Sequence, residues 1–408
     1  MSNRWRTLSI AMANRNPAAV SREKPLGVLF LAQTPPPHHG QSAVAETVRM
    51  VLETEAHADI TQIWRGGAAT NDDIGKKTPA KFFGFLRLLI DLTVLWIRGQ
   101  RFDVAYLGIA PWAHTAFRDA ILAACAKGLA NRTLLHIHGQ GLDDRLGKRG
   151  FAGRFVRACL SGTEAIAMTG AVAAMTRSSG LFHSVLPLAN TAADPGDIAR
   201  SASTAPFVIG CLGNLDPRKG VFDFIDVVGR ASVDGPRSVR AVIIGGPTAA
   251  LSAEDAQAYA RENGGETPIT VTGWVSEGEK SRLLGEIDVF LYLSHHDLAP
   301  VALIEALAHG CVPIVLDIGG LSEMMGSELR HLVIEPDEKA AEKALAIIEG
   351  YRRDPSSLER DRKRARIQYH LTFSLDAFSR QLLRHLSGQP DNTGAGRIGG
   401  LPITEPAP

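Results

Sequence analysis

Residues 287–315, IDVFLYLSHHDLAPVALIEALAHGCVPIV, contain the pattern that predicts the fold class of this chain. The apolar run 288–293 is rich in β-branched and aromatic residues, as expected of a buried strand. A polar loop follows, and Pro300 stands where the first turn of a helix tolerates proline. Residues 301–308 are predicted to form a short helix, and residues 277–286 are predicted to form the helix that leads to this stretch.

The end of this stretch returns to a strand. Gly310 suits the position that follows a helix, and residues 311–315 form the next predicted strand. This order is typical of an open parallel α/β sheet, which binds ligands at the carboxyl ends of its strands. Two acids, Asp297 in the loop and Glu305 in the helix, are separated by seven residues and are expected at that edge.

Residues 297–313, DLAPVALIEALAHGCVP, resemble the acidic motif of the retaining nucleotide-sugar glycosyltransferases, a large family that includes sucrose synthases and bacterial mannosyltransferases. The usual motif is Glu, seven residues and Glu, followed by Ala-x-Ala-x-Gly-x-Pro. Here Asp297 replaces the first Glu, while Glu305, Gly310 and Pro313 keep their register. The resemblance implies the GT-B fold, an α/β architecture of two Rossmann-like domains that face each other across a cleft.

The resemblance covers roughly residues 26–386 and implies a domain division. The expected segments are a disordered tail (1–24), an N-terminal acceptor-binding domain (25–195), a linker (196–206), a C-terminal nucleotide-sugar-binding domain (207–365), a C-terminal helix that returns to the first domain (366–388) and a second disordered tail (389–408).

A second motif supplies the expected cation. Residues 213–220, GNLDPRKG, resemble the family's Gly-Arg-Leu-x3-Lys-Gly signature, whose cations neutralise the donor diphosphate in relatives. Lys219 and Gly220 match this signature, whereas Asn214 occupies the arginine position. Arg218 is the neighbouring residue that could supply the second cation.

Two further candidates follow predicted strands in the N-terminal half. Gly40 ends a Pro/Gly loop before a predicted helix at 41–52 and resembles the glycine that lets backbone amides approach the diphosphate. A Pro-rich turn without a binding role is the alternative. His138 directly follows the predicted strand 133–137 and resembles the histidine that reaches the sugar or acceptor in relatives. A lone histidine is otherwise more often structural.

The resemblance also implies roles. Glu305 would bind the ribose hydroxyls of the donor, and Asp297 would lie near the transferred sugar. Lys219 and backbone amides near Gly40 and Val301 would stabilise the departing diphosphate. Family members retain the anomeric configuration, with the leaving phosphate as base. The sequence has no Asp-x-Asp motif, so we expect neither a metal nor another cofactor.

Composition and patterning argue against several other classes of protein, namely nucleic-acid-binding, disulfide-rich, exported and membrane-spanning proteins. Of the 408 residues, 45% are apolar and 21% charged, and a net charge of +1 gives no reason to expect nucleic acid. The cysteines have no disulfide or metal-ligand spacing and lie at Cys125, Cys159, Cys211 and Cys311. Residues 1–24 lack the apolar segment of a signal peptide, and the apolar run 88–97 is too short to span a bilayer. We therefore expect a cytoplasmic protein.

Two basic and aromatic stretches, residues 76–101 and 145–157, predict a contact with anionic lipid. The protein would then be peripheral on the inner face of the cytoplasmic membrane, where it would meet a lipid-linked glycan acceptor. The alternative for residues 76–101 is a core-facing helix with a basic start.

Two functional alternatives stay open at the sequence level. Asp297 and Asn214 replace the expected residues, which would also suit a non-catalytic scaffold or a protein that only binds nucleotide sugars. A relative with different chemistry, such as a sugar-nucleotide epimerase or an inverting transferase, is disfavoured by the acidic spacing and by Lys219-Gly220.

Overall fold

The computed structural model describes residues 24–35, 40–63, 79–109, 115–138, 150–197, 206–231 and 238–387. The described ranges leave out the predicted tails except residue 24, most of the predicted linker, and the basic residues Lys76, Lys77 and Arg149. Two six-stranded sheets organise the described chain. The predicted α/β architecture with two Rossmann-like sheets is therefore confirmed.

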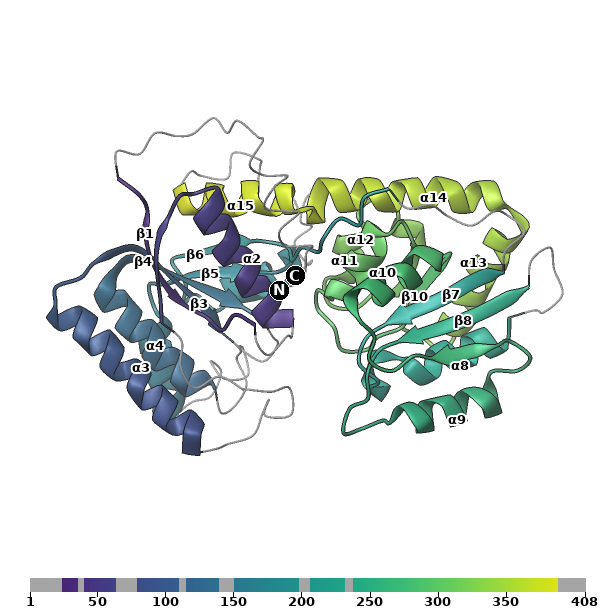
Figure 1. Cartoon of the computed structure of the whole chain (residues 1–408), viewed down its shortest axis with the longest axis horizontal. Coiled ribbons are helices and arrows are strands. Elements are labelled where there is room, and N and C mark those ends of the chain that lie inside the picture. The colour runs from purple at the N-terminus through teal and green to yellow at the C-terminus, as the bar shows by residue number, and fades with distance from the viewer. Residues whose placement is uncertain are drawn as a thin grey trace. The chain divides into compact units, whose positions relative to one another are not determined.

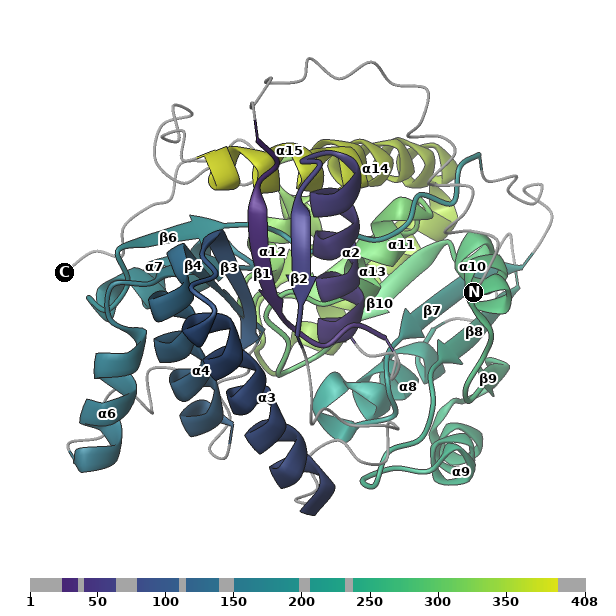
Figure 2. The same cartoon turned by 60° about the vertical axis from the view of Figure 1, so that its left-hand side comes forward.

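The first sheet has the strand order β2-β1-β3-β4-β5-β6. Its strands are β1 (Gly27–Leu31), β2 (Asp59–Gln62), β3 (Phe102–Ile109), β4 (Ala130–Ile137), β5 (Glu164–Ala167) and β6 (Ser184–Pro187). The helices of this part are α2 (Gly40–Thr54), α3 (Pro79–Ile97), α4 (Ala116–Leu129), α6 (Phe151–Leu160) and α7 (Gly170–Ser178). Figure 2 shows α2 beside the parallel pair β1 and β2.

The second sheet has the order β12-β11-β10-β7-β8-β9, and each of its neighbouring pairs is parallel. Its strands are β7 (Phe207–Leu212), β8 (Val239–Ile244), β9 (Ile269–Val271), β10 (Val289–Tyr292), β11 (Val312–Leu316) and β12 (Val333–Ile334). Its helices are η2 (Pro217–Lys219), α8 (Val221–Gly229), α9 (Ala253–Asn263), α10 (Glu277–Glu286), α11 (Val301–Ala308), α12 (Leu321–Met325), η3 (Arg330–Leu332) and α13 (Ala340–Arg353).

The order in which the chain adds parallel strands to the second sheet reverses between β7 and β10. Strands β8 and β9 extend the sheet on one side of β7, and β10, β11 and β12 extend it on the other. Figure 1 shows α8 and α9 on one face of this sheet and α10 and α11 on the opposite face. Such a switch point leaves an open crevice at the carboxyl ends of the two central strands, where ligands bind in α/β folds.

Strand β10 lies in the core of this sheet. Phe290 and Leu291 are fully buried, as the predicted apolar strand requires. Asp288, just before β10, is buried as well, and its Oδ2 accepts a hydrogen bond from the backbone N–H of Val208, 2.8 Å away. Its Oδ1 pairs with the Arg362 guanidinium. The buried carboxylate is thus satisfied and joins β10 to β7 and to α14 (Pro355–Gln368).

The last part of the chain is helical. Helix α14 passes through the π-helical turn η4 (Tyr369–Phe373) into α15 (Leu375–Ser387), as Figure 1 shows in yellow. In α15, the Gln381 side chain donates to the carbonyl oxygen of Pro187 at the end of β6, over 2.7 Å. His385 Nε2 lies 2.9 Å from the same oxygen.

Several predicted elements match the observed ones closely. Helix α11 spans residues 301–308 and α10 spans residues 277–286, both as predicted, and Gly310 has the positive φ of +63° that suits its place after α11. The sequence did not predict β2, whose residues DITQ are polar, nor the two-residue strand β12. Neither segment is long or apolar enough to show a periodic pattern.

The described chain falls into two compact units, one from residues 1–106 with 126–132 and one from residues 107–125 with 133–408. This division passes through β3, so the domain limits proposed from the sequence stay predictions. Within the described residues, we find no helix that is long and apolar enough to cross a membrane.

Candidate active site

Two loops at the carboxyl ends of β7 and β10 are held together by their backbones. Asp216 precedes η2, and its Oδ1 accepts the backbone N–H of Arg218 at 2.9 Å. The carbonyl oxygen of Arg218 then accepts the backbone N–H of His295 at 2.9 Å. Gly220 has φ +72°, and a Cβ there would lie 2.1 Å from the carbonyl oxygen of Leu293. Only glycine fits this close approach, which fixes the loop that carries Lys219.

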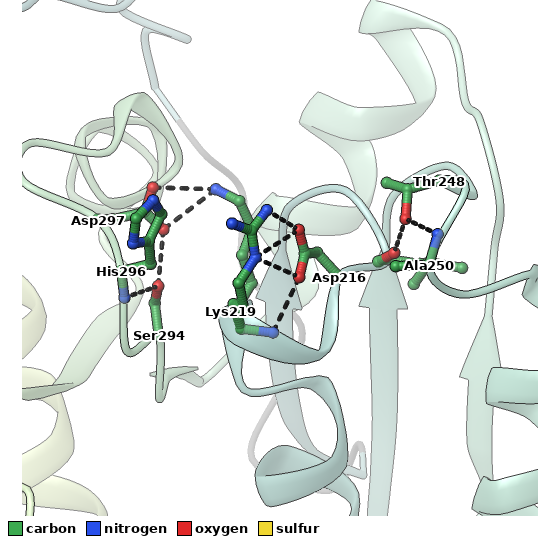
Figure 3. A network of polar contacts seen from close by, with 9 residues as sticks. Asp216, Lys219, Thr248, Ala250, Ser294, His296 and Asp297 are labelled. Carbon is green, nitrogen blue, oxygen red and sulfur yellow. Dashed lines mark hydrogen bonds and ion pairs between the residues drawn. The ribbon is translucent and has the colours of Figure 1, made fainter. Parts of the chain in front are cut away.

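Lys219 and Asp297 meet between these loops (Figure 3). The Lys219 Nζ lies 3.0 Å from Asp297 Oδ1 and 3.1 Å from Oδ2. Asp297 Oδ2 also accepts hydrogen bonds from the Tyr292 hydroxyl at 2.6 Å and from the Ser294 hydroxyl at 2.7 Å. Two residues that the sequence proposed separately, 78 positions apart, therefore form one part-buried ion pair.

The charge of Asp297 is set by these donors. Burial raises the pKa of the Asp297 carboxyl, but the Lys219 charge and the hydrogen bonds from Tyr292 and Ser294 outweigh it, so the pKa lies below its usual value. Burial, and next the Asp297 charge, raise the pKa of Tyr292. Oδ2 receives three donors and Oδ1 receives one, and a carboxylate offers about four lone-pair sites in all. Oδ1 thus keeps capacity for a hydroxyl of a ligand.

The neighbouring cation Arg218 points to a different partner. Its guanidinium Nη2 lies 2.7 Å from Asp216 Oδ2, and its side chain is 67% exposed. The Asp216 hydrogen bond and charge raise the pKa of Arg218. Figure 3 shows Asp216 between Lys219 and Thr248, with the Lys219 side chain directed instead toward Asp297. Asn214 is exposed at the start of the same loop.

Glu305, the second acid of the motif, has a lysine of its own. The Lys280 Nζ of α10 lies 2.7 Å from Glu305 Oε1 and 3.0 Å from Glu277 Oε1. Lys280 and Glu305 side chains are 20% and 19% exposed, so the pair is largely shielded from water. Burial lowers the pKa of Lys280, but the charge and hydrogen bond of Glu305 outweigh it and the pKa is raised.

Helix α11 carries Glu305 and begins at the same edge of the sheet. Pro300 has extended backbone angles just before the helix, and Val301 is the first helical residue. The first N–H groups of a helix lack intrahelical acceptors and carry partial positive charge. Val301 thus stands at a helix start beside β10, and its role as an amide donor to the diphosphate stays a prediction.

The two N-terminal candidates, Gly40 and His138, belong to segments next to strands of the first sheet. Gly40 is the first residue of α2, after β1, within the first compact unit. His138 directly follows β4, where its backbone N–H donates to the carbonyl oxygen of Ile109 at 3.0 Å. Its ring packs against the buried ring of His136, with 4.1 Å between centroids. Lys219 and Asp297 are in direct contact, whereas Gly40 begins α2 and His138 follows β4.

Three contributors to these pairs were missed at the sequence level. Tyr292 was assigned only to the strand, Ser294 only to the loop and Lys280 only to a helix. Ser294 stands three residues before Asp297, a spacing that a turn brings within reach. Lys280 is 25 positions from Glu305, and no local pattern links them. Folding of α10 against α11 decides that contact.

This arrangement suits the binding of an anionic ligand beside a group with hydroxyls. A lysine and a free helix start can stabilise negative charge that develops on a phosphate-like group. The remaining capacity on Asp297 can accept a hydroxyl proton, and the Glu305 carboxylate can accept hydroxyls as well. Lys219, Asp297 and the start of α11 lie at the switch point between β7 and β10, and Glu305 lies further along α11.

Part of the chain that contains this site is similar to known proteins. Residues 206–352 match the family described as "Glycosyl transferases group 1". Over 99 residues, the chain is 31% identical to the GDP-mannose:cellobiosyl-diphosphopolyprenol alpha-mannosyltransferase of Komagataeibacter xylinus. That stretch is 24% of this chain and spans only about a quarter, 25%, of that enzyme.

Solved structures match over more of the chain. Sucrose-phosphate synthase from Thermosynechococcus elongatus superposes with a TM-score of 0.65 and 16% identity, over 89% of this chain and 99% of that one. HepE from Anabaena, solved in complex with UDP, gives a TM-score of 0.64 and 16% identity, over 89% of this chain and 100% of the other. At such identities the likeness concerns the fold.

Proposed function

We propose that the protein is a retaining glycosyltransferase, because residues 206–352 match the family described as "Glycosyl transferases group 1" and the chain has the GT-B fold. It would move a sugar from a nucleoside-diphosphate sugar to a glycan or glycolipid acceptor. The observation that carries the proposal is the contact between Lys219 and Asp297 at the switch point of the second sheet.

Each candidate site residue beside the second sheet has a proposed role. Lys219 exchanges part of its contact with Asp297 for the diphosphate and stabilises the charge that develops as the sugar departs. Asp297 Oδ1 accepts a sugar hydroxyl, and Glu305 accepts the ribose hydroxyls. Backbone amides at the start of α11 at Val301, together with Gly220, line the phosphate side.

Other assignments carry over as parts of the same proposal. Arg218 adds a second positive charge once it leaves Asp216, and Asn214 borders the donor where relatives have arginine. Gly40 would bring backbone amides to the diphosphate, and His138 would contact the sugar or acceptor. We propose that none of these steps requires a metal or another resident cofactor.

The substrates follow from two considerations. The mannosyltransferase relative is named for GDP-mannose and for a cellobiosyl-diphosphopolyprenol acceptor, and HepE was solved with UDP. We therefore propose a nucleoside-diphosphate hexose as donor and a lipid-linked intermediate of cell-surface polysaccharide synthesis as acceptor. Such an acceptor would place the enzyme peripherally on the inner face of the cytoplasmic membrane.

Donor binding by the full chain is the first test. The melting temperature is measured with GDP-mannose, UDP-glucose, ADP-glucose and the free nucleotides, because a ligand that binds the native state raises it by mass action. We expect a rise with one nucleotide family that persists in Lys219→Ala only at higher concentration. No rise with any donor in the wild type would contradict the proposal.

Transfer itself is measured with the donor that binds. Nuclear magnetic resonance of the product, or of slowly hydrolysed donor, reports whether the anomeric configuration is retained. A product of inverted configuration would still show that the protein is a glycosyltransferase, but it would contradict the retaining mechanism. Binding without turnover across lipid-linked acceptors would favour a protein that only binds nucleotide sugars.

A further inference from the structure

Helix α3 is apolar on the face that packs inward and also on the face that points outward. Leu88 and Leu92 are its buried residues. Because successive residues turn by about 100°, the opposite face is made by residues at spacings of three and four. These residues form one stripe, which we call the α3 stripe: Phe83, Leu86, Ile90, Val94 and Ile97.

The α3 stripe is solvent-exposed along the whole helix. Its exposed fractions run from 37% for Val94 to 71% for Ile97. Phe82 and Trp96 flank it and are 65% and 59% exposed. A surface helix of a soluble domain normally carries polar residues on this face. A contiguous apolar stripe of this length instead marks a surface that docks onto something apolar.

The charges around the stripe indicate what docks there. Residues 76–101 contain six lysines and arginines and one acid, Asp91, a net charge of +5 by subtraction. Arg98 and Arg101 are exposed just beyond the end of α3, and Arg87 is 66% exposed on its flank. A second copy of the chain would bring the same positive charge to the contact. Anionic lipid headgroups complement it, and acyl chains complement the stripe.

We propose that α3 anchors the protein on an anionic lipid bilayer. The helix lies in the plane of the interface with the α3 stripe among the acyl chains and the flanking cations among the headgroups. The sequence predicted an electrostatic contact, whereas the exposed stripe makes apolar insertion the larger contribution. This inference rests on the proposed function, which already places the protein at a membrane, and it names the helix that makes the contact. Binding to lipid can be measured without donor or acceptor.

Vesicle flotation of the full chain tests the anchor. Vesicles of phosphatidylcholine alone are compared with vesicles that also contain phosphatidylglycerol, at low and high salt. The test variant is Phe83→Gln/Ile90→Gln/Ile97→Gln. The matched control, Ile367→Gln/Leu371→Gln, changes side chains that are 56% and 71% exposed but lie outside α3.

We expect the wild type to float with anionic vesicles and to keep part of its binding at high salt, since apolar insertion is not screened. The test variant should lose at least about tenfold in partition coefficient, whereas the control should match the wild type. Arg98→Gln/Arg101→Gln should remove mainly the salt-dependent part. Melting curves of each variant show that it is folded.

A second measurement does not depend on the triple variant. Insertion of α3 should shift Trp96 fluorescence to shorter wavelength on addition of anionic vesicles, and Trp96→Phe should lose that shift. No flotation of the wild type, or equal flotation of the test variant, would overturn the proposal. A wild-type dimer that the variant loses, without lipid binding, would reassign the stripe to a contact between copies. Donor-induced melting shifts, measured in parallel, report separately on the proposed function.

Discussion

The two acids of the motif, Asp297 and Glu305, are both paired with a lysine, but in different surroundings. Asp297 is held by Lys219 and by the hydroxyls of Tyr292 and Ser294, all at the ends of β7 and β10. Glu305 is held by Lys280, a residue of α10, which lies on the same face of the second sheet as α11. One carboxylate thus belongs to the loops at the switch point, and the other belongs to two packed helices.

From this difference we infer separate roles in catalysis and in nucleotide binding for the two ion pairs. The Lys219–Asp297 pair joins two loops whose backbones are already fixed by Gly220, so it can present a charge at a defined place. The Lys280–Glu305 pair instead orients a side chain on a helix. We expect the first pair to act mainly on the chemical step and the second mainly on nucleotide affinity. The predictions below test that division.

The largest expected effect is that of Lys219→Ala. Removing a preorganised positive charge that faces the leaving group typically lowers kcat by about 10²–10³, or about 3–4 kcal/mol in the barrier. Steady-state transfer with the best donor measures it. Arg282→Ala is the matched control, because Arg282 is an exposed cation of α10 that is paired with Glu279 and has no proposed role at the donor. Equal losses in both variants would show that Lys219 has no special position.

Asp297 should come next. Asp297→Ala removes the acceptor for Lys219, Tyr292 and Ser294 and should abolish most turnover. Asp297→Glu adds one methylene, roughly 1.5 Å of reach, which displaces the carboxylate from Tyr292 and Ser294. We expect it to keep partial activity and to change the preferred donor sugar across a panel. Full activity of both variants with the same donor would make the role of Asp297 structural.

A smaller effect is expected of Lys280→Gln. The variant leaves Glu305 without its cation, so the carboxylate is less well oriented for the ribose, and donor KM should rise about tenfold with little change in kcat. Lys280→Arg should restore much of the affinity, because it keeps the charge. Titration calorimetry with the free nucleotide gives the affinity directly. A fall in kcat at constant KM would contradict the division of duties.

The smallest effect concerns pH. Asp297 has a pKa below its ordinary value of 3.8, so its stabilisation is fully present above that pH and is lost as the pH falls through the folded pKa. Lys280 has a pKa above its ordinary value of 10.5, so its stabilisation is fully present below that pH and is lost as the pH rises through the folded pKa. Neither Asp297 nor Lys280 should titrate between about pH 5 and about pH 9.

Melting temperatures of the wild type, Asp297→Asn and Lys280→Gln, measured side by side, check this expectation. The differences between wild type and each variant should stay constant across that window. They should narrow below it for Asp297→Asn and above it for Lys280→Gln. A difference that changes near neutral pH would mean that another group, such as a histidine, controls the pair.

Much of the fold follows from local patterns in the sequence. The apolar run before Ser294, the helix limits of α10 and α11 and the positive φ of Gly310 were all predicted from residue type and spacing. Such features depend on neighbours a few residues apart, so a single sequence contains them. The short polar strand β2 was not predictable, because its pairing with β1 depends on tertiary context rather than its own pattern.

In the candidate site, too, some features follow from the sequence and others depend on the tertiary structure. The sequence by itself determined which residues carry charge at the strand ends, Lys219, Asp297 and Glu305 among them, because motif register needs only spacing. Only the tertiary structure decided their partners. Lys219 bonds Asp297 rather than remaining alone, Arg218 bonds Asp216, and Lys280 reaches Glu305 across 25 positions of chain. Pairings over such separations depend on how strands and helices pack, since a side chain meets only what the fold brings to it.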